Sequence, residues 1–532
     1  MATEPVDVLV VGAGTSGLSL ALQAHDHGAH VRVVERRPEE FRPSRAMVMH
    51  PRTLEVLRPL GVTDALLERA DTSPAVQLHL GRRVVPVRVS DLDLPDTAFP
   101  HLTLIRQADV EAVLAAALAE RGVEVERGTA LVEATTTPDR ARATLHREEA
   151  VEEVDCHHLA GCDGPASTVR GAAGIGWRGA PYAQEVVLAD VELDGDVAPG
   201  LAHVVAGRHG LVFLFNVGER ATWRLLATRP AGTDALPFGQ PGPPVPGDEL
   251  QALLLTAGLP ATITHVAWSA RVRLQHRLAT AMRRGRLYLV GDAAHAHSPA
   301  AAQGMNTGIQ DATNLGWKLA LAARAERQHG VGTQTLLDSY ERERWPVARL
   351  VLAATHATFW AEAGTDPLAT LARSRLAPLG APLIPALLRR RRLVAEGVRL
   401  LSGFRVSYRG SPLSLEDDPV PGGPHAGDRL PDEAVTCAGR RTRLHDLTAV
   451  PGTHVLLQRD APPVSHADLG QPGPDADAHP SQRPGAHLHR VTSMRGHGVL
   501  VVRPDGYVGY RSGEADPTLI RDWLVLAGEG HG

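Results

Sequence analysis

The chain begins with a Gly-x-Gly-x-x-Gly motif between a predicted strand and a predicted helix, and no other feature restricts the fold as strongly. The apolar run 6–11 is typical of a buried strand, and residues 16–27 have the character of a helix that stops at Gly28. Residues 30–35 predict a second strand. A strand, a glycine-rich turn, a helix and a strand form the βαβ unit that binds dinucleotides in open α/β sheets.

Each glycine of this motif has its own physical role. Gly12 permits the tight turn, and Gly14 lets a pyrophosphate approach the backbone N–H groups. Gly17 lets the helix and the strand pack closely. Thr15 and Ser16 begin the helix, whose N-terminus stabilises the negative charge of a phosphate. We therefore expect these five residues to bind the pyrophosphate.

A carboxylate ends the predicted second strand. Glu35 lies 21 residues after Gly14, a spacing at which an acidic side chain accepts hydrogen bonds from an adenosine ribose. Arg36 follows directly, and we expect it at the same nucleotide site.

The glycine motif alone does not separate NAD from FAD, so a second strand end far along the chain decides between them. Residues 286–290 predict an apolar strand, and Gly291 and Asp292 follow it. Ligands of open α/β sheets bind at the C-terminal edges of the strands, so Asp292 is a candidate to hold the ribityl hydroxyls of a flavin. The nucleotide domain is thus predicted to be discontinuous and to bind FAD.

Changes in pattern along the chain predict four parts. Residues 1–175 begin the nucleotide domain, and residues 176–275 have short β-rich runs separated by Gly, Pro and Asp turns. Residues 276–405 complete the nucleotide domain and add a helical segment, and residues 410–532 form a C-terminal unit. The predicted class is α/β, with a Rossmann-like FAD-binding domain and an inserted mixed sheet for the substrate.

Composition excludes several classes of partner. The chain has 532 residues and a formal net charge of -5, so it predicts more than one core and no nucleic-acid partner. Glu4 and Asp7 occupy positions where a signal peptide would be basic, and no apolar run reaches the ~18 residues of a membrane span. The near-neutral charge favours a small-molecule substrate. Cys156, Cys162 and Cys437 form no C-x-x-C pair, which favours a reducing cytoplasm.

Taken in order, the motifs of the first 320 or so residues resemble the group A flavoprotein hydroxylases, the p-hydroxybenzoate and phenol hydroxylase superfamily with its larger polyketide-tailoring members. The resemblance rests on a set of short motifs: Gly12 to Gly17, Glu35, Ser44-Arg45-Ala46, Gln107 with Glu111, Cys162-Asp163-Gly164, Gly291 to His295, Gln303 to Ala312 and Asn314 to Leu319.

The resemblance implies further contacts with FAD. Arg45 and Gln107 are expected to contact the cofactor, and Asp163-Gly164 to contact both FAD and the reduced nicotinamide. The loop before the next helix is expected to surround the flavin ring through Pro299, Gly304, Met305 and Asn306. This loop departs from the family pattern, because Ser298-Pro299-Ala300-Ala301-Ala302-Gln303 stands where relatives often have Pro-Pro-x-Gly-Gly-Gln.

Two histidines flank this loop, and the C-terminal unit adds a third domain. We expect structural or supporting roles for His295 and His297, because the sequence identifies no carboxylate partner for either. The unit from about residue 410 resembles the thioredoxin-like domain of the larger family members. It lacks C-x-x-C, so we expect structural or oligomer contacts, such as those of a homodimer, in place of disulfide chemistry.

The implied activity is that of an NAD(P)H-dependent flavin monooxygenase that uses O2. The resemblance implies that a flavin C4a-hydroperoxide hydroxylates an aromatic ring. The large chain, together with the resemblance to polyketide-tailoring members, favours a polycyclic or polyketide substrate over a simple phenol. Trp223 and Arg224 are candidates for the substrate pocket, while the base that activates the substrate, the choice of NADPH or NADH and the regiochemistry stay open. Two alternatives also stay open: a Baeyer–Villiger or ring-opening oxygenase, and a flavin-binding protein or dehydrogenase without productive use of O2.

Overall fold

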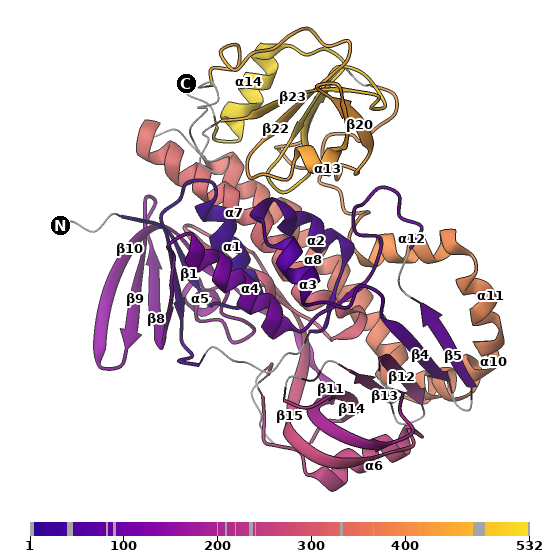
Figure 1. Ribbon diagram of the computed structural model, residues 1–532. Helices are drawn as coiled ribbons and strands as arrows, with labels where there is room; N and C mark the ends of the chain where they lie inside the picture. Colours follow the sequence, from indigo (N-terminus) through magenta and orange to yellow (C-terminus); the bar gives the residue numbers. More distant parts are fainter. Residues whose placement is uncertain are drawn as a thin grey trace.

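In the described residues of the computed structural model, three large β-sheets and one two-stranded ribbon are surrounded by helices (Figure 1). The structure describes residues 5–39, 46–80, 83–88, 92–198, 200–207, 210–216, 218, 220–232, 238–239, 241–329, 333–364, 366–418, 420–471 and 485–529. Ser44 and Arg45 lie outside the described residues. No described helix is long and apolar enough to cross a membrane.

The first sheet is built around the N-terminal strand, as the glycine motif predicts. Its order is β16-β17-β10-β1-β2-β7, and β1 pairs in parallel with β2 and β10. The hairpin β8–β9 continues antiparallel from β10. The strands are β1 (Val6–Val11), β2 (Val31–Glu35), β7 (Val125–Arg127), β8 (Thr129–Thr136), β9 (Ala141–Arg147), β10 (Ala150–Gly161), β16 (Arg283–Arg284) and β17 (Leu287–Leu289). Parallel pairing of β17 with β10 joins the two separated halves of the nucleotide domain.

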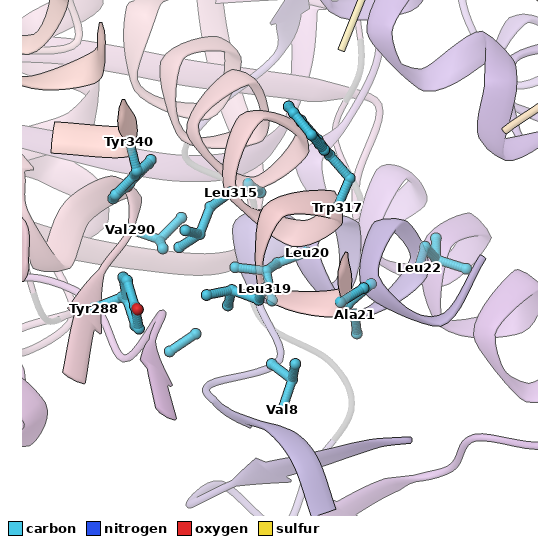
Figure 2. Close-up of a cluster of buried hydrophobic side chains, with 14 of the residues drawn as sticks. Val8, Leu20, Ala21, Leu22, Tyr288, Val290, Leu315, Trp317, Leu319 and Tyr340 are labelled. Atoms are coloured by element: carbon cyan, nitrogen blue, oxygen red, sulfur yellow. The ribbon is translucent and has the colours of Figure 1, made fainter. Parts of the chain in front are cut away.

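Helices α1 (Thr15–His25) and α7 (Gln303–His329) cross closely beside this sheet. Gly316 of α7 makes the crossing possible, because a Cβ there would lie 2.7 Å from the Cβ of Gln23. Figure 2 shows side chains of β1, α1, α7 and α8 together with Tyr288 and Val290 in one buried core. The other helical elements of this domain are α2 (Pro51–Leu57), η1 (Arg58–Leu60), α3 (Thr63–Glu68), α4 (Gln107–Glu120), α5 (Thr168–Ala172) and η2 (Gly291–Ala293), with a short ribbon of β3 (Val48–Met49) and β6 (Thr103–Leu104).

The second sheet has the order β18-β15-β11-β14-β13-β12-β4-β5. Its strands are β4 (Ala75–Leu80), β5 (Arg83–Arg88), β11 (Trp177–Gly195), β12 (Leu201–Gly207), β13 (Gly210–Phe215), β14 (Trp223–Pro230), β15 (Ala261–Ala279) and β18 (His295–Ala296). The domain boundary expected at residue 176 leaves residues 75–88 outside this sheet. In the structure β4, which lies before that boundary, belongs to the sheet and pairs in parallel with β12. Helix α6 (Gly247–Thr256) covers one face of the sheet.

A long helix and several short ones follow α7. Helix α8 (Gln334–Ala363) contacts η3 (Ala300–Ala302) as well as β13 and β15 of the second sheet. The chain then passes through α9 (Pro367–Leu371), η4 (Ala372–Leu376), α10 (Ala377–Gly380), η5 (Ala381–Leu383), α11 (Ile384–Leu388) and α12 (Arg391–Leu401). Arg389 to Arg392 are exposed, as expected of a solvated helix surface.

The third sheet forms the C-terminal domain at the top of Figure 1. Its order is β19-β25-β24-β22-β23-β20-β21, from the strands β19 (Leu415–Asp417), β20 (Ala434–Cys437), β21 (Arg440–Arg443), β22 (His454–Gln458), β23 (His487–Thr492), β24 (Val499–Val502) and β25 (Val508–Ser512), with helices α13 (Leu444–Leu447) and α14 (Pro517–Leu526). The predicted class is confirmed: an α/β protein with a Rossmann-like FAD-binding domain, an inserted mixed sheet and this third domain.

A buried ion network joins the C-terminal domain to α8. The guanidinium of Arg503 donates to both oxygens of Glu343, at 2.7 and 2.8 Å. Lys318, the only lysine of the sequence, donates to the same carboxylate at 2.7 Å. Burial lowers the pKa of Lys318 to about 8 against the attraction of Glu343. Charges this deep in a protein require partners, so the junction is held by complementary ionic groups.

Candidate active site

A cavity of about 760 Å³ lies between the first and second sheets. One end is lined by the glycine loop and polar groups, and the other by apolar and aromatic side chains of the second sheet. The structure brings the following predicted residues to its wall: Gly12, Gly14, Thr15, Ser16, Glu35, Arg36, Gln107, Asp163, Gly164, Asp292, Pro299, Gly304 and Met305. Residues predicted from distant parts of the sequence therefore share one cavity.

The glycine loop has the close contacts that the motif predicts. Gly12 has a φ of +105°, and a Cβ there would lie 2.4 Å from the carbonyl oxygen of Cys162. A Cβ on Gly17 would lie 1.9 Å from the carbonyl oxygen of Gly12. Gly17 is not part of the cavity wall, so it packs α1 onto β1 while Gly14 caps the helix at the wall. The N-terminus of α1 is thereby directed at the polar end of the cavity.

Glu35 anchors this loop. Its Oε2 accepts a hydrogen bond from the N–H of Ala13 at 3.0 Å, and its Oε1 accepts one from the N–H of Arg37 at 3.0 Å. Although burial favours the neutral acid, hydrogen bonds from Arg37 and Ala13 lower the pKa of Glu35. Arg36 beside it is exposed at the cavity wall. The guanidinium of Arg37 also donates to this carboxylate, at 3.1 Å to Oε1 and 3.3 Å to Oε2, so the protein holds Glu35 in place at the cavity wall.

Asp163 and Asp292 present carboxylate oxygens to the cavity. Oδ2 of Asp163 accepts hydrogen bonds from the N–H groups of Thr168 and Val169, at 2.7 and 3.3 Å. Its Oδ1 is buried and has no partner among the described residues. Burial raises the pKa of Asp163. Asp292 lines the same cavity after β17, so both acids are available to the N–H or O–H groups of a ligand.

The loop from Ser298 to Asn306 has a strained backbone. Ala301 and Ala302 have φ values of +56° and +52°, in the left-handed region that glycine prefers. These are the two positions at which relatives often have glycine. Asn306 is fully buried away from the cavity wall, where it donates to the carbonyl oxygens of Val48 and Ala302 and accepts from His50 N–H. It fixes the loop through the protein's own hydrogen bonds.

The two histidines before this loop differ in their partners. The sequence identified no carboxylate for either, but Nε2 of His295 lies 2.6 Å from Oδ2 of Asp311. Arg344 binds the other oxygen of Asp311 at 2.6 Å, so His295 belongs to a buried ionic network. His297 lines the cavity, and its Nε2 has no partner in the described part of the chain. Burial lowers the pKa of His297, which favours a neutral ring at the wall.

The second sheet supplies an aromatic chamber. Phe213, Leu226 and Trp268 lie on the face that lines the cavity. Trp223 does not, because it packs on the opposite face against α6. Arg224 is fully buried and is not part of the wall. Its guanidinium donates to Asp190 at 2.5 Å and lies 5.6 Å from the centre of the Trp268 ring, so it supports a wall residue.

Sequence reasoning did not identify two other wall residues. His50 lines the cavity, and its Nδ1 lies 3.1 Å from the carbonyl oxygen of Leu401 at the end of α12. Burial lowers the pKa of His50 to about 4. Glu362 lines the cavity from the last turn of α8, and burial raises its pKa to about 7. No sequence motif marks either residue, so neither could be identified before the cavity was seen in the structure.

A second, wider hollow of about 1020 Å³ has different chemistry. Two of its arginines are paired with carboxylates that also line it: Arg286 with Glu326 at 2.7 Å, and Arg283 with Asp338 at 2.6 Å. These groups are already satisfied, so this hollow is the weaker candidate for an active site.

A flavin dinucleotide fits the residues of the first cavity. The N-terminus of α1 lies at the wall, the buried Oδ1 of Asp163 lacks a partner among the described residues, and Asp292 adds a carboxylate beyond β17. Gln107 lines the same wall and donates to Glu111 at 2.8 Å. The expected contact of Arg45 lies outside the described residues.

Comparison with known proteins agrees with this arrangement. Residues 5–355 match the family described as "FAD binding domain", and residues 423–525 match "Aromatic-ring hydroxylase, C-terminal". A 6-methylpretetramide 4-monooxygenase of Streptomyces rimosus is 33% identical over 533 residues, which cover 95% of this chain and 91% of the relative.

Solved structures extend the similarity to the whole architecture. The anhydrotetracycline hydroxylase OxyS of Streptomyces rimosus is 28% identical with a TM-score of 0.73, over 98% of this chain and 97% of that one. An aklavinone-11 hydroxylase, solved as a ternary complex with FAD and aklavinone, is 25% identical with a TM-score of 0.73. That match covers 99% of this chain and 100% of the other.

Proposed function

This chain belongs to the FAD-dependent aromatic-ring hydroxylases, and from that premise we propose that its substrate is a polycyclic aromatic polyketide. The enzyme is a flavin-dependent monooxygenase that uses a reduced nicotinamide and O2. The relatives named for tetracycline intermediates and aklavinone act on or bind fused-ring compounds, which supports a substrate of the same kind.

One observation carries the proposal: a single cavity joins the glycine loop to a chamber lined by Phe213, Phe215 and Trp268. Such a chamber favours a flat, apolar ligand, because aromatic rings pack against one another in stacked or edge-on arrangements. The volume of about 760 Å³ extends over both the nucleotide end and this chamber.

The residues of the chain hold and shield the reactants. The glycine loop and the N-terminus of α1 would bind the pyrophosphate, Glu35 the adenosine ribose, and Asp292 the ribityl hydroxyls. When bound, FAD takes up a hydride from the nicotinamide and activates O2 for oxygen transfer to the ring. The second sheet encloses the substrate and excludes water, which protects reactive oxygen species from unproductive decay.

The reduced nicotinamide is proposed to bind transiently. Only one Gly-x-Gly-x-x-Gly motif follows a strand and begins a helix, so the sequence provides no separate nicotinamide domain. Asp163 and Gly164 at the wall are candidates for both cofactors. The choice between NADPH and NADH, a cytoplasmic location and a homodimer remain predictions.

The test is NADPH and NADH oxidation by the FAD-loaded enzyme across a panel of phenols, naphthoquinones and fused-ring polyketides. O2 uptake, H2O2 release and product mass are recorded together. We expect a fused-ring compound to accelerate NAD(P)H oxidation with little H2O2 and to gain one oxygen atom on a ring carbon. Oxygen inserted between two carbons would instead identify a Baeyer–Villiger reaction, and no stimulation by any compound would refute the proposal.

A further inference from the structure

The carboxylate of Glu362 occupies an unusual position in the apolar part of the cavity. It lies one residue before the end of α8, and this helix packs against β13 and β15 of the second sheet. Phe213 and Trp268 line the same cavity from those strands. Within the described ranges, no hydrogen bond or ion pair involves the side chain of Glu362. An ionisable group therefore lines the chamber without a partner among the residues that the structure describes.

Two physical effects make this a poor position for a carboxylate that only supports the fold. Burial penalises the ionised form, and it raises the pKa of Glu362 to about 7. The negative end of the α8 dipole adds a further penalty, because Glu362 lies in the last helical turn. A glutamine or leucine at this position would avoid both free-energy penalties, so the presence of a carboxylate points to a function.

The other titratable groups around the chamber do not neutralise this carboxylate. Arg273 lines the cavity from β15, with its guanidinium 5.1 Å from the centre of the Phe238 ring. His297 lines it before the strained loop and has a lowered pKa. On α8 itself, His356 lies 3.3 Å from the hydroxyl of Tyr182, two turns before Glu362. Burial, and no charged neighbour, accounts for the shifted pKa of Glu362.

The remaining titratable groups of this region stay within their own cluster. His276 of β15 packs against Tyr182 and His356 with tilted rings, whose centres are 4.9 and 4.5 Å away. Burial lowers the pKa of His276 and raises that of Tyr182. Neither group is ionised near neutral pH, so neither supplies a charge to Glu362.

We propose that Glu362 is the catalytic base that accepts the proton of a ring hydroxyl on the bound aromatic substrate. This inference rests on the proposed function, because it requires a hydroxylated aromatic in the chamber. The substrate O–H bond breaks, the proton moves to a carboxylate oxygen of Glu362, and the electron pair stays on the phenolate oxygen. The phenolate then donates electron density into the ring, which makes its carbons better nucleophiles toward an electrophilic oxygen.

The first test measures binding without turnover. FAD-loaded enzyme, kept oxidised and free of NAD(P)H, is titrated with 2-naphthol and with its matched ether 2-methoxynaphthalene while flavin fluorescence is followed. Native enzyme should bind 2-naphthol roughly tenfold or more tightly than Glu362→Gln at pH 8, since a charge-assisted hydrogen bond is lost. At pH 6 the difference should shrink, and the ether should bind both proteins equally.

Two further variants separate a base from a structural residue. Glu362→Asp should retain part of the preference for 2-naphthol, and the exposed Glu120→Gln on α4 should retain all of it. Equal 2-naphthol affinity of native enzyme and Glu362→Gln at pH 8, or no binding of 2-naphthol to native enzyme, overturns the proposal.

A second test uses turnover and distinguishes this inference from the proposed function. With a compound that the native enzyme hydroxylates, kcat of Glu362→Gln should fall by about 10²- to 10⁴-fold, while NAD(P)H oxidation continues with release of H2O2. Full hydroxylation by Glu362→Gln refutes the role of Glu362 and leaves the proposed function intact. Failure of the native enzyme to respond to any aromatic compound refutes the proposed function itself.

Discussion

Replacement of Glu362 by glutamine should stabilise the protein, and the gain should depend on pH. Burial raises the pKa of Glu362 from 4.5 to about 7 in the folded protein. Between pH 4.5 and 7, the carboxyl group is therefore protonated in the folded protein and ionised in the unfolded chain. Unfolding therefore releases a proton in this range, and the native protein loses stability as the pH rises from about 4.5 through 7. The loss is complete above pH 7 and amounts to about 3 kcal/mol.

Glutamine has nearly the same shape and no charge, so the variant avoids this loss. An unfolding entropy of about 2.1 cal/mol/K per residue gives ~1.1 kcal/mol/K for a chain of this length, so the variant should melt ~3 °C higher at pH 8. At pH 5 the two proteins should melt together. The measurement is thermal denaturation of both proteins and of Glu120→Gln between pH 5 and 8. A Tm difference that does not change with pH, or one that favours the native protein at pH 8, would refute the reasoning.

Three other predictions follow from the structure. Glu343→Gln leaves the buried cations Lys318 and Arg503 without their shared anion. It should lower the free energy of unfolding by about 3–5 kcal/mol and Tm by ~3–4 °C in thermal denaturation. A change in Tm below ~1 °C would contradict the role of the network. Ala301→Gly and Ala302→Gly each remove the strain of a left-handed alanine, which costs about 1–2 kcal/mol. Glycine also raises the conformational entropy of the unfolded chain, which destabilises the folded protein by about 0.5–1 kcal/mol. Each substitution should therefore be neutral or stabilise the protein by up to ~1 kcal/mol. A lower Tm in either variant would mean that the alanines gain from contacts that offset the strain. Glu35→Ala should weaken FAD about 10- to 150-fold in fluorescence titrations of the apoprotein, and an unchanged Kd would remove Glu35 from the site.

The nucleotide end of the site follows closely from local sequence. A strand, a glycine turn and a helix fix their own geometry over a few residues, so the positions of Gly12 and Glu35 relative to β1 and β2 could be predicted. Asp292 could be added because parallel strands place their C-terminal ends at one edge of a sheet. Each of these inferences depends on short-range order and on one rule of sheet topology.

The residues that line the chamber could not be predicted from a single sequence. Alternation along β14 predicts that Trp223 and Arg224 point to opposite faces, but not which face lines the cavity. The structure turns Trp223 to α6 and satisfies Arg224 with Asp190. The pairing of β4 with β12 and the partnership of His295 with Asp311 are likewise tertiary contacts without a local signal.

The position of α8 explains why a C-terminal domain without redox cysteines matters to this site. In the first half of α8, Glu343 binds Arg503 of the C-terminal domain, and Arg344 binds Asp311 beside the strained loop. Its last turn carries Glu362 into the chamber. Pro346 interrupts the backbone hydrogen bonds of α8 between these ion pairs and Glu362. The C-terminal domain therefore supports the first half of α8, while packing of Phe359 and Ala363 against Tyr182 of β11 holds the last turns, which carry Glu362.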